Sequence, residues 1–335
     1  AIREAMEGKH FQEFKDIDYL PEKLGKRVLT TGGHFGYLKI AEGCDKHCTY
    51  CIIPKLRGKF RSVPMERLVT QAKEMAEEGV KELILVAQET TVYGTDIYGK
   101  KSLHILLKEL CKIKGIRWIR VLYCYPEEIY DELIQTMKEE KKICHYLDLP
   151  IQHASDRILK RMGRRTTQAE LVEIVNKLRR EIPDIVLRTT LISGFPGETQ
   201  EDHEELMSFV DEMEFDRLGV FTYSPEEDTP AATMPDQVAE EVKEARRDEI
   251  MELQQEISYD KGTDRIGQEL LVMIEGKVAD ESAYIGRTYG DAPKVDGYIF
   301  VQTGELLMTG DFAKVRVTGA LEYDLIGELA DEYTE

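Results

Sequence analysis

Three cysteines near the start of the chain have the type and spacing that could do chemistry. Cys44, Cys48 and Cys51 form a C-x3-C-x2-C pattern within eight residues. A loop this tight can place three thiolates on three corners of one iron–sulfur cubane, which leaves one of the four irons open to a further ligand. The spacing therefore predicts that these cysteines bind a 4Fe–4S cluster and serve as both metal ligands and catalytic residues.

Zinc is the competing interpretation of the same motif. A structural zinc site usually takes four protein ligands, and a catalytic one usually takes a histidine or carboxylate set. His47 lies between the cysteines and could be a fourth ligand, but we interpret it as a loop residue at the rim. Cys111, Cys124 and Cys144 lie in apolar surroundings, and we expect them to be buried core thiols.

The composition narrows the class of protein. The 335 residues, 42% hydrophobic and 33% charged, suit a globular chain with one large domain and one small one. No apolar run reaches the roughly 18 residues of a membrane helix, and the polar first residues do not resemble a signal peptide. The six cysteines lack the spacing of a secreted disulfide protein, which predicts a cytoplasmic location. A net charge of −19 disfavours nucleic acid and favours basic partners.

The elements that must position the cysteines form a repeating series. Short apolar runs alternate with helical patterns, which predicts a parallel sheet with helices outside. Right-handed crossovers would curl this α/β sheet toward a partial, TIM-like (β/α)6 barrel, with its chemistry at the carboxyl ends of the strands. The cysteines follow the first strand. The expected strands are 35–41, 82–88, 116–125, 145–152, 184–192 and 216–224, and the expected helices are 65–79, 102–113, 127–140, 155–162, 167–181 and 199–213.

Composition shifts divide the chain into four segments. The last segment has short β-like runs punctuated by glycine, which predicts a small antiparallel barrel of OB type. The segment before it has the pattern of one long amphipathic helix. The predicted segments are a polar lead-in at 1–34, the (β/α)6 domain at 35–234, the connecting helix at 235–263 and the small barrel at 264–335.

A C-x3-C-x2-C motif after the first of six β/α units resembles the radical S-adenosylmethionine superfamily. The resemblance implies that a reduced cluster donates an electron to the sulfonium of S-adenosylmethionine, which releases methionine and a 5′-deoxyadenosyl radical. It also implies that Tyr50, which precedes the third cysteine, lies near the cofactor. An alternative role for Tyr50 is packing under the loop.

Polar residues at other strand ends fit the same site. The resemblance implies that they line the S-adenosylmethionine pocket, although each could be structural. Arg188 stands out because a permanently charged guanidinium on an otherwise apolar strand needs an anion, and the methionyl carboxylate is one. The glycines of GFPGET (194–199) would let the backbone approach a ligand. The predicted pocket residues are Gln88, Gln152, Ser155, Arg188 and Thr190.

Longer stretches resemble the methylthiotransferase branch of that superfamily. They are EGCDKHCTYCIIPKLRGKFRSVP, LPIQHASDRILKRMGRR, LISGFPGETQEDHEEL and YSPEEDTPAA, and the final barrel matches that family's TRAM domain. Such enzymes insert sulfur and then a methyl group at an unactivated C–H bond. A radical is needed because such a carbon offers no acidic proton. One branch modifies an adenosine in tRNA, and the RimO-type branch modifies the β-carbon of an aspartate in small-subunit ribosomal protein twelve.

Three features favour the RimO type. The segments IQHASDR and RTYGDAPKVDG look like RimO sequences. Residues 267–330 carry eleven Asp or Glu against five Lys or Arg, a net charge of −6, whereas an RNA-gripping barrel should be basic. Aromatic residues are not interleaved with Lys or Arg as on an RNA-stacking surface. We therefore expect a basic ribosomal protein to dock on the acidic barrel, with no direct RNA binding. An inert acidic surface is the alternative.

Two further expectations and two alternatives remain. Members of the family carry an N-terminal domain with three more cysteines and a second cluster for sulfur delivery. The 43 residues before Cys44 hold no cysteine, so the sequence predicts that this domain is missing and that the fragment cleaves S-adenosylmethionine without inserting sulfur. An electron donor must supply the reducing electron. The tRNA methylthiotransferase and an iron–sulfur module without chemistry of its own remain the alternatives.

Overall fold

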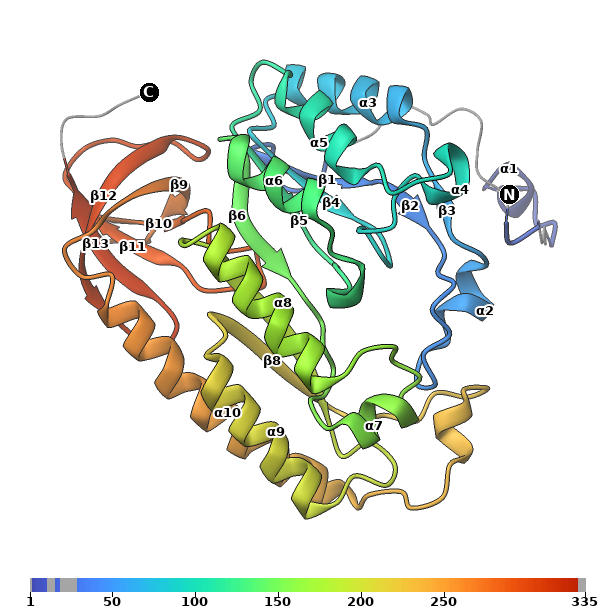
Figure 1. Ribbon diagram of the computed structural model, residues 1–335. Coiled ribbons are helices and arrows are strands. Elements are labelled where there is room, and N and C mark those ends of the chain that lie inside the picture. Colours follow the sequence, from blue (N-terminus) through green and yellow to red (C-terminus); the bar gives the residue numbers. More distant parts are fainter. Residues whose placement is uncertain (1, 11–15, 19–28, 331–335) are drawn as a thin grey trace.

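A computed structural model describes residues 2–10, 16–18 and 29–330 of the protein. Within this part, six strands form one parallel sheet in the order β1-β4-β5-β6-β7-β8 (Figure 1). The outer edges of β1 and β8 pair with no other strand of the described residues, so the sheet is the partial barrel that the sequence predicts. The strands are β1 (Phe35–Lys39), β4 (Glu82–Val86), β5 (Trp118–Val121), β6 (Ile143–Asp148), β7 (Val186–Ser193) and β8 (Arg217–Thr222).

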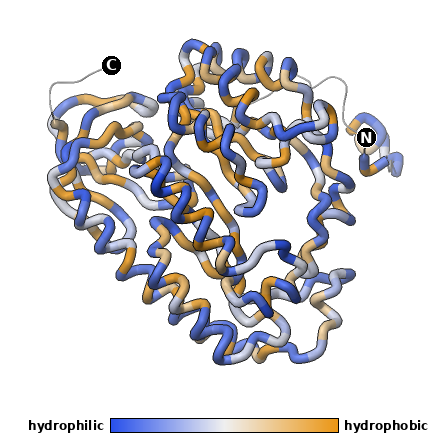
Figure 2. The backbone as a smooth tube through the Cα atoms, viewed as in Figure 1, coloured by the Kyte–Doolittle hydropathy of each residue, from blue (hydrophilic) through white to orange (hydrophobic). Residues whose placement is uncertain are grey.

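Amphipathic helices cover the outer face of this sheet. In α3, for example, Leu68, Ala72 and Met75 are buried, because residues three and four apart share one face of a helix. Figure 2 shows apolar colour along the inner strands and polar colour on the outer turns of the helices. Thr167 and Thr199 start their helices with capping boxes. The covering helices are α3 (Met65–Glu77), α5 (Leu103–Cys111), α6 (Asp131–Glu139), α8 (Gln168–Glu181) and α9 (Gln200–Met213).

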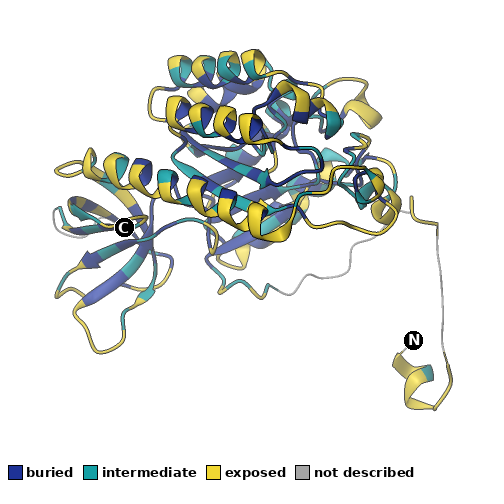
Figure 3. Ribbon diagram, turned by 90° about the horizontal axis from the view of Figure 1, so that it is seen from below, coloured by how far each residue is buried: buried dark blue, intermediate teal, exposed yellow. Residues whose placement is uncertain are grey.

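Short elements occupy the loops. The helix α1 buries none of its residues (Figure 3), and the predicted lead-in at 1–34 lies partly outside the described residues. Strands β2 and β3 pair as a two-stranded ribbon at the carboxyl end of β1. The short elements are α1 (Ile2–Met6), β2 (Ala41–Glu42), α2 (Ile53–Arg57), β3 (Arg61–Ser62), α4 (Thr95–Tyr98), η1 (Pro126–Glu128), α7 (Asp156–Arg161) and η2 (Pro230–Thr233).

One long helix, α10 (Glu240–Thr263), connects the sheet to the C-terminal part. It buries Ile250 and Ile257, and the amide nitrogen of Gln254 donates a hydrogen bond of 2.8 Å to the carbonyl oxygen of Phe215. The helix begins at Glu240 and not at 235, because Asp236 takes a left-handed backbone conformation with φ of 62°. Among the described residues, no helix has the length and apolar character needed to cross a membrane.

The C-terminal part is a closed five-stranded barrel in the order β10-β11-β13-β12-β9. Its pairs are antiparallel, as the sequence predicts, except β11 with β13, which are parallel. The exception arises because β13 inserts between β11 and β12. The strands are β9 (Glu269–Lys277), β10 (Ala283–Arg287), β11 (Ile299–Gln302), β12 (Phe312–Ala320) and β13 (Leu325–Leu329).

The small barrel packs against the face of the sheet that the helices leave uncovered. Successive strand residues point to opposite faces, so Ile84 faces the small barrel while its neighbours face the helices. Trp118 meets Phe312 of the barrel edge to face, with ring centroids 4.9 Å apart. Met273 of β9 belongs to the same buried apolar cluster. The uncovered face is thus closed by a second domain at one end.

Buried charges hold this junction together. Glu82 accepts a hydrogen bond of 2.8 Å from Arg120 and another of 2.7 Å from Arg287 of the small barrel, and all three side chains are fully buried. Arg287 also pairs with Glu275 at 2.6 Å. Burial alone would raise the pKa of Glu82, but the two guanidinium groups outweigh it and lower the pKa below 4.5. The junction therefore depends on a carboxylate that stays charged.

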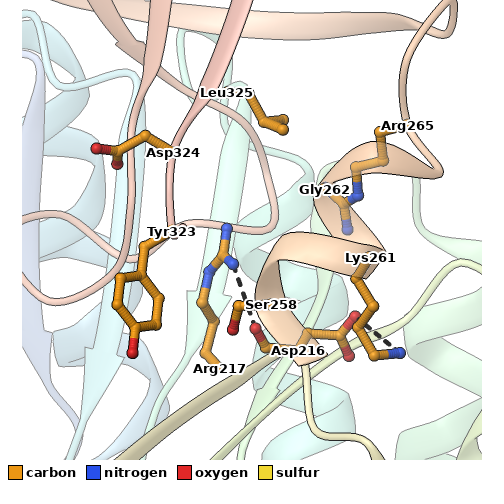
Figure 4. A pocket seen from close by; sticks show the side chains of 9 residues that line it. All are labelled: Asp216, Arg217, Ser258, Lys261, Gly262, Arg265, Tyr323, Asp324 and Leu325. Atoms are coloured by element: carbon orange, nitrogen blue, oxygen red, sulfur yellow. Dashed lines mark hydrogen bonds and ion pairs between the residues drawn. The ribbon is translucent and has the colours of Figure 1, made fainter. Parts of the chain in front are cut away.

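A second contact lies between β8, α10 and the β12–β13 turn. Figure 4 shows that Tyr323, Asp324 and Leu325 of the small barrel line a small pocket together with residues at the end of α10. Lys261 of this helix pairs with Asp216 at 3.8 Å. The pocket between the small barrel and the end of α10 measures about 10 Å³, which is room for about one water molecule and not for a cofactor.

Glu82→Gln should lower the free energy of unfolding by about 3–5 kcal/mol at neutral pH, because it leaves Arg120 and Arg287 buried without their counter-ion. Urea unfolding followed by the fluorescence of Trp118, the single tryptophan, measures this loss. Because folding lowers the pKa of Glu82, its stabilisation is present at neutral pH and is lost as the pH falls below 4.5. The difference from the native chain should therefore shrink in acid.

Glu109→Gln is the matched control, because Glu109 pairs with Lys112 at 2.6 Å on the surface. Removing one partner of an exposed pair should cost less than about 1 kcal/mol. Equal unfolding free energies for the two variants at neutral pH would contradict the assigned role of Glu82.

Candidate active site

The three predicted cluster ligands lie on one loop between β2 and α2, at the carboxyl end of β1. Cys44 and Cys48 are buried and Cys51 is partly buried. The backbone N–H of Cys44 donates to the carbonyl oxygen of Gly58 at 3.2 Å, and that of Cys51 donates to Cys48 at 3.0 Å. Gly43 has φ of 77° and lies against the backbone that precedes β3, where no side chain would fit. The local backbone thus brings the three thiols into one loop.

The competing zinc interpretation requires donors that converge on a single ion. In the residues that the structure describes, no three His, Cys, Asp or Glu side chains converge closely enough to hold one ion. His47 is an exposed loop residue with φ of 54°. Tetrahedral zinc needs four donors on one ion, whereas a cubane takes one thiolate at each of its irons and accepts wider spacing.

Two thiols of this loop, those of Cys44 and Cys51, are poor acids. Burial raises the pKa of Cys44 to about 11, and burial also raises the pKa of Cys51. Both groups are therefore protonated at neutral pH in the absence of metal. Iron must displace these protons when it binds, since the thiolate is the ligand.

A cavity of about 610 Å³ opens beside the cysteine loop, at the carboxyl ends of β1, β4 and β5. That volume suits a cofactor the size of a nucleoside with an amino acid attached. Gln88 lines it, and its side-chain oxygen is buried without a hydrogen-bond partner in the described part of the chain. The lining residues are Tyr37, Lys39, Cys44, Cys51, Ile53, Val86, Ala87, Gln88, Tyr123 and Tyr125.

Arg188 differs from its sequence prediction. Its guanidinium already has anions on the chain, since it pairs with Asp148 of β6 at 2.8 Å and with Asp296 of the small barrel at 3.3 Å. It lines a separate cavity of about 380 Å³ at the junction with the small barrel. An unpaired charge therefore does not assign Arg188 to a ligand, because its partners Asp148 and Asp296 are distant in sequence and no local pattern reveals them.

The other predicted pocket residues are not among those that line the cysteine cavity. The hydroxyl of Ser155 donates to the buried carboxylate of Asp202 at 2.7 Å. Gln152 has φ of 73°, and its backbone N–H donates to the carbonyl oxygen of Thr190 at 2.9 Å. Tyr50 packs edge to face on Phe195, with ring centroids 6.4 Å apart, under the cysteine loop.

The GFPGET loop is held by a residue that the sequence analysis did not single out. Glu198 accepts hydrogen bonds from the backbone of Gly194 at 2.8 Å and of Phe195 at 3.1 Å, and it pairs with Arg246 of α10 at 2.9 Å. A side chain on Gly194 would meet Lys243. Protein side chains thus approach the backbone closely at these glycines.

Two further residues near Cys48 were missed from sequence. The hydroxyl of Tyr125 lies 3.6 Å from the Cys48 sulfur, and the Arg164 guanidinium lies 4.2 Å from the centre of the Tyr125 ring. In sequence Arg164 belongs to RMGRR, where nothing distinguishes it from Arg161 and Arg165. Only the fold shows which of the three arginines turns inward.

Comparisons with known protein families give separate matches for the sheet and for the small barrel. The family model of the Radical SAM superfamily matches residues 38–210, and the model of the TRAM domain matches residues 266–330. The first match covers most of the sheet but ends before β8, and the second covers the small barrel.

Curated relatives match across nearly the whole chain. The ribosomal protein uS12 methylthiotransferase RimO of Lachnoclostridium phytofermentans is 64% identical over 326 residues, which are 97% of this chain and 74% of the relative. The protein of that name from Clostridium perfringens is 57% identical over 308 residues, 92% of this chain and 68% of the relative. Among solved structures, the radical S-adenosylmethionine methyltransferase TsrM of Kitasatospora setae, with cobalamin and a [4Fe-4S] cluster bound, has a TM-score of 0.50 at 16% identity. The match covers 59% of this chain and 38% of that one, and it concerns the fold alone.

Ser155→Ala should lower the free energy of unfolding by about 1.5–3 kcal/mol, because the hydroxyl donates to a buried charged group. Gln88→Leu should be nearly neutral, because no protein hydrogen bond is lost with its orphaned oxygen. Urea unfolding of both variants beside the native chain measures the contrast. An unchanged stability of Ser155→Ala would show that its hydroxyl is free to serve a ligand.

Proposed function

Because the chain belongs to the Radical SAM superfamily and, within it, to the RimO family of ribosomal protein uS12 methylthiotransferases, we propose that it methylthiolates the β-carbon of an aspartate in uS12. The observation that carries the proposal is the cysteine loop at the carboxyl end of β1, with Cys44 and Cys51 facing a cofactor-sized cavity. In α/β barrels the active site lies at the carboxyl ends of the strands, which is where this loop lies.

The proposed cofactors are a 4Fe–4S cluster on Cys44, Cys48 and Cys51 and S-adenosylmethionine in the adjoining cavity. Together they supply a 5′-deoxyadenosyl radical that removes a hydrogen atom from an unactivated carbon. In this cavity the unpaired amide oxygen of Gln88 is available to a donor on the ligand. The ring of Tyr37 supplies part of the apolar wall that excludes water.

The remaining predicted residues enter the proposal in different roles. Arg188 holds Asp148, whose second oxygen accepts from the backbone N–H of Tyr123 at 3.1 Å, so Arg188 positions a residue of the cavity wall. Ser155 holds the start of α7 through its bond to a buried carboxylate. We retain three residues as candidate contacts at the rim of the cofactor pocket, namely Tyr50, Gln152 and Thr190.

The substrate side of the proposal is electrostatic. Residues 267–330 carry a net charge of −6, and ribosomal proteins are basic, so we propose that uS12 docks on the small barrel. The same charge argues against direct RNA binding there. We also propose that an electron donor supplies the electron that reduces the cluster. The proposed location is the cytoplasm, where ribosomes are found.

Sulfur delivery calls for a second cluster in the family that the sequence resembles. Cys111, Cys124 and Cys144 do not repeat the spacing of the first triad, and two of them are fully buried in apolar clusters. We therefore propose that the second cluster is held by residues outside this chain.

Anaerobic reconstitution with iron and sulfide, followed by reduction with S-adenosylmethionine present, tests the radical chemistry. The native chain should bind about four irons and release 5′-deoxyadenosine, whereas Cys48→Ala should lose both. Equal product from Cys48→Ala, or none from a fully loaded native chain, would contradict the proposal.

The substrate is tested separately by binding. A uS12 peptide that carries the aspartate should bind the native chain more tightly than an anticodon stem-loop does, and added salt should weaken that binding. Preference for the stem-loop would point to the tRNA branch.

A further inference from the structure

Arg164 is a buried cation with unused hydrogen-bonding capacity. Its side chain is 1% exposed, and none of its three guanidinium nitrogens has a hydrogen-bond partner in the described residues. Buried polar groups are almost always bonded, and a guanidinium has five N–H donors to satisfy. Such a group has donors left for a further acceptor, because its ion pair with Glu127 at 3.5 Å makes no hydrogen bond.

The cysteine loop lies directly against this arginine. The backbone N–H of Thr49 donates to the carbonyl oxygen of Met162 at 2.9 Å, and the Thr49 hydroxyl donates to the carbonyl oxygen of Arg161 at 2.8 Å. The turn at Gly163, with φ of 72°, then leads the chain into Arg164. The segment that carries the guanidinium is therefore fixed to the segment between Cys48 and the third cysteine.

A single aromatic ring separates the guanidinium from a predicted ligand sulfur. Arg164 stacks on the ring of Tyr125 at 4.2 Å, and the hydroxyl of that ring lies 3.6 Å from the Cys48 sulfur. The field of the cation thus reaches the Cys48–Tyr125 pair.

The charge of Arg164 is only partly balanced. Its nearest carboxylate, Glu127, lies 3.5 Å away without a hydrogen bond. Lys46 on the same tyrosine ring, at 5.0 Å, is instead paired closely with Glu128. Of these two cations, Arg164 is the one whose charge is incompletely neutralised and whose N–H donors lack hydrogen-bond partners.

We propose that Arg164 is a positioning residue that stabilises negative charge on the cluster held by Cys44, Cys48 and Cys51 and so sets its reduction potential. The inference rests on the cluster site of the proposed function. A cubane with three thiolates is anionic, and reduction adds one more negative charge. A fixed cation in a medium of low dielectric favours the reduced form more than the oxidised form, which raises the potential.

The test is a redox titration of the reconstituted cluster, followed by electron paramagnetic resonance, without substrate. Arg164→Met should shift the midpoint to a more negative potential, and Arg164→Lys should lie between it and the native chain. Glu127→Gln removes the competing anion and should shift the midpoint to a more positive potential. If Arg164 and Tyr125 had only a structural role, the two variants would not shift the midpoint potential in opposite directions.

Arg217→Met is the matched control, because Arg217 is a partly buried arginine that pairs with Asp291 at 2.6 Å at the junction with the small barrel. It should leave the midpoint potential unchanged even if it lowers stability. Unchanged potentials in Arg164→Met and Glu127→Gln, or shifts of the same sign, would overturn the inference.

Failure of the inference is distinguishable from failure of the proposed function. If the native chain takes up no cluster, the cluster site itself falls and the role of Arg164 falls with it. If the cluster forms with about four irons but its potential is indifferent to these variants, only the inference falls. Should Arg164→Met not fold, the positive shift required of Glu127→Gln decides the question.

Discussion

Glu82 lies fully buried between Arg120 and Arg287, and each of its oxygens accepts a hydrogen bond from one of them. The first arginine belongs to the neighbouring strand and the second to the small barrel, so one carboxylate ties the two parts of the molecule together. The partial barrel leaves the inner face of its strands without helices, and an open face of this kind must be covered or solvated. Here the small barrel covers one end, which leaves the carboxyl ends of the strands free for the cysteine loop.

Local patterns in the sequence determine most of the fold. The run at Glu82–Val86 is apolar because helices cover one face of this strand and the small barrel covers part of the other. The helices between the strands follow the period of 3.6 residues. Boundaries are less visible. The pattern of α10 extends back to 235, but the left-handed backbone of Asp236 delays the helix. The parallel pair β11–β13 follows from strand insertion, which is a property of topology and not of any one segment.

In the candidate site, too, local features are visible in the sequence and long-range contacts are not. The three cysteines are close together in the sequence, so their spacing alone indicates a cluster loop. Arg188 could not be placed from sequence, because the carboxylates that neutralise it come from another strand and from the small barrel. Arg164 could not be separated from its neighbours in RMGRR, because burial depends on the turn at Gly163. Interactions between residues close in the chain are thus predictable here, and charge compensation between distant residues is not.

The shared carboxylate at the junction also limits how such a molecule can be recombined. A different β-barrel fused after α10 would have to bring a guanidinium to the place of Arg287 and an acidic side chain toward Arg217, or leave buried charges without counter-ions. The architecture therefore changes at about residue 264, but the two parts cannot be replaced independently at that point. For protein engineering, this means that the sheet and the small barrel must be exchanged together.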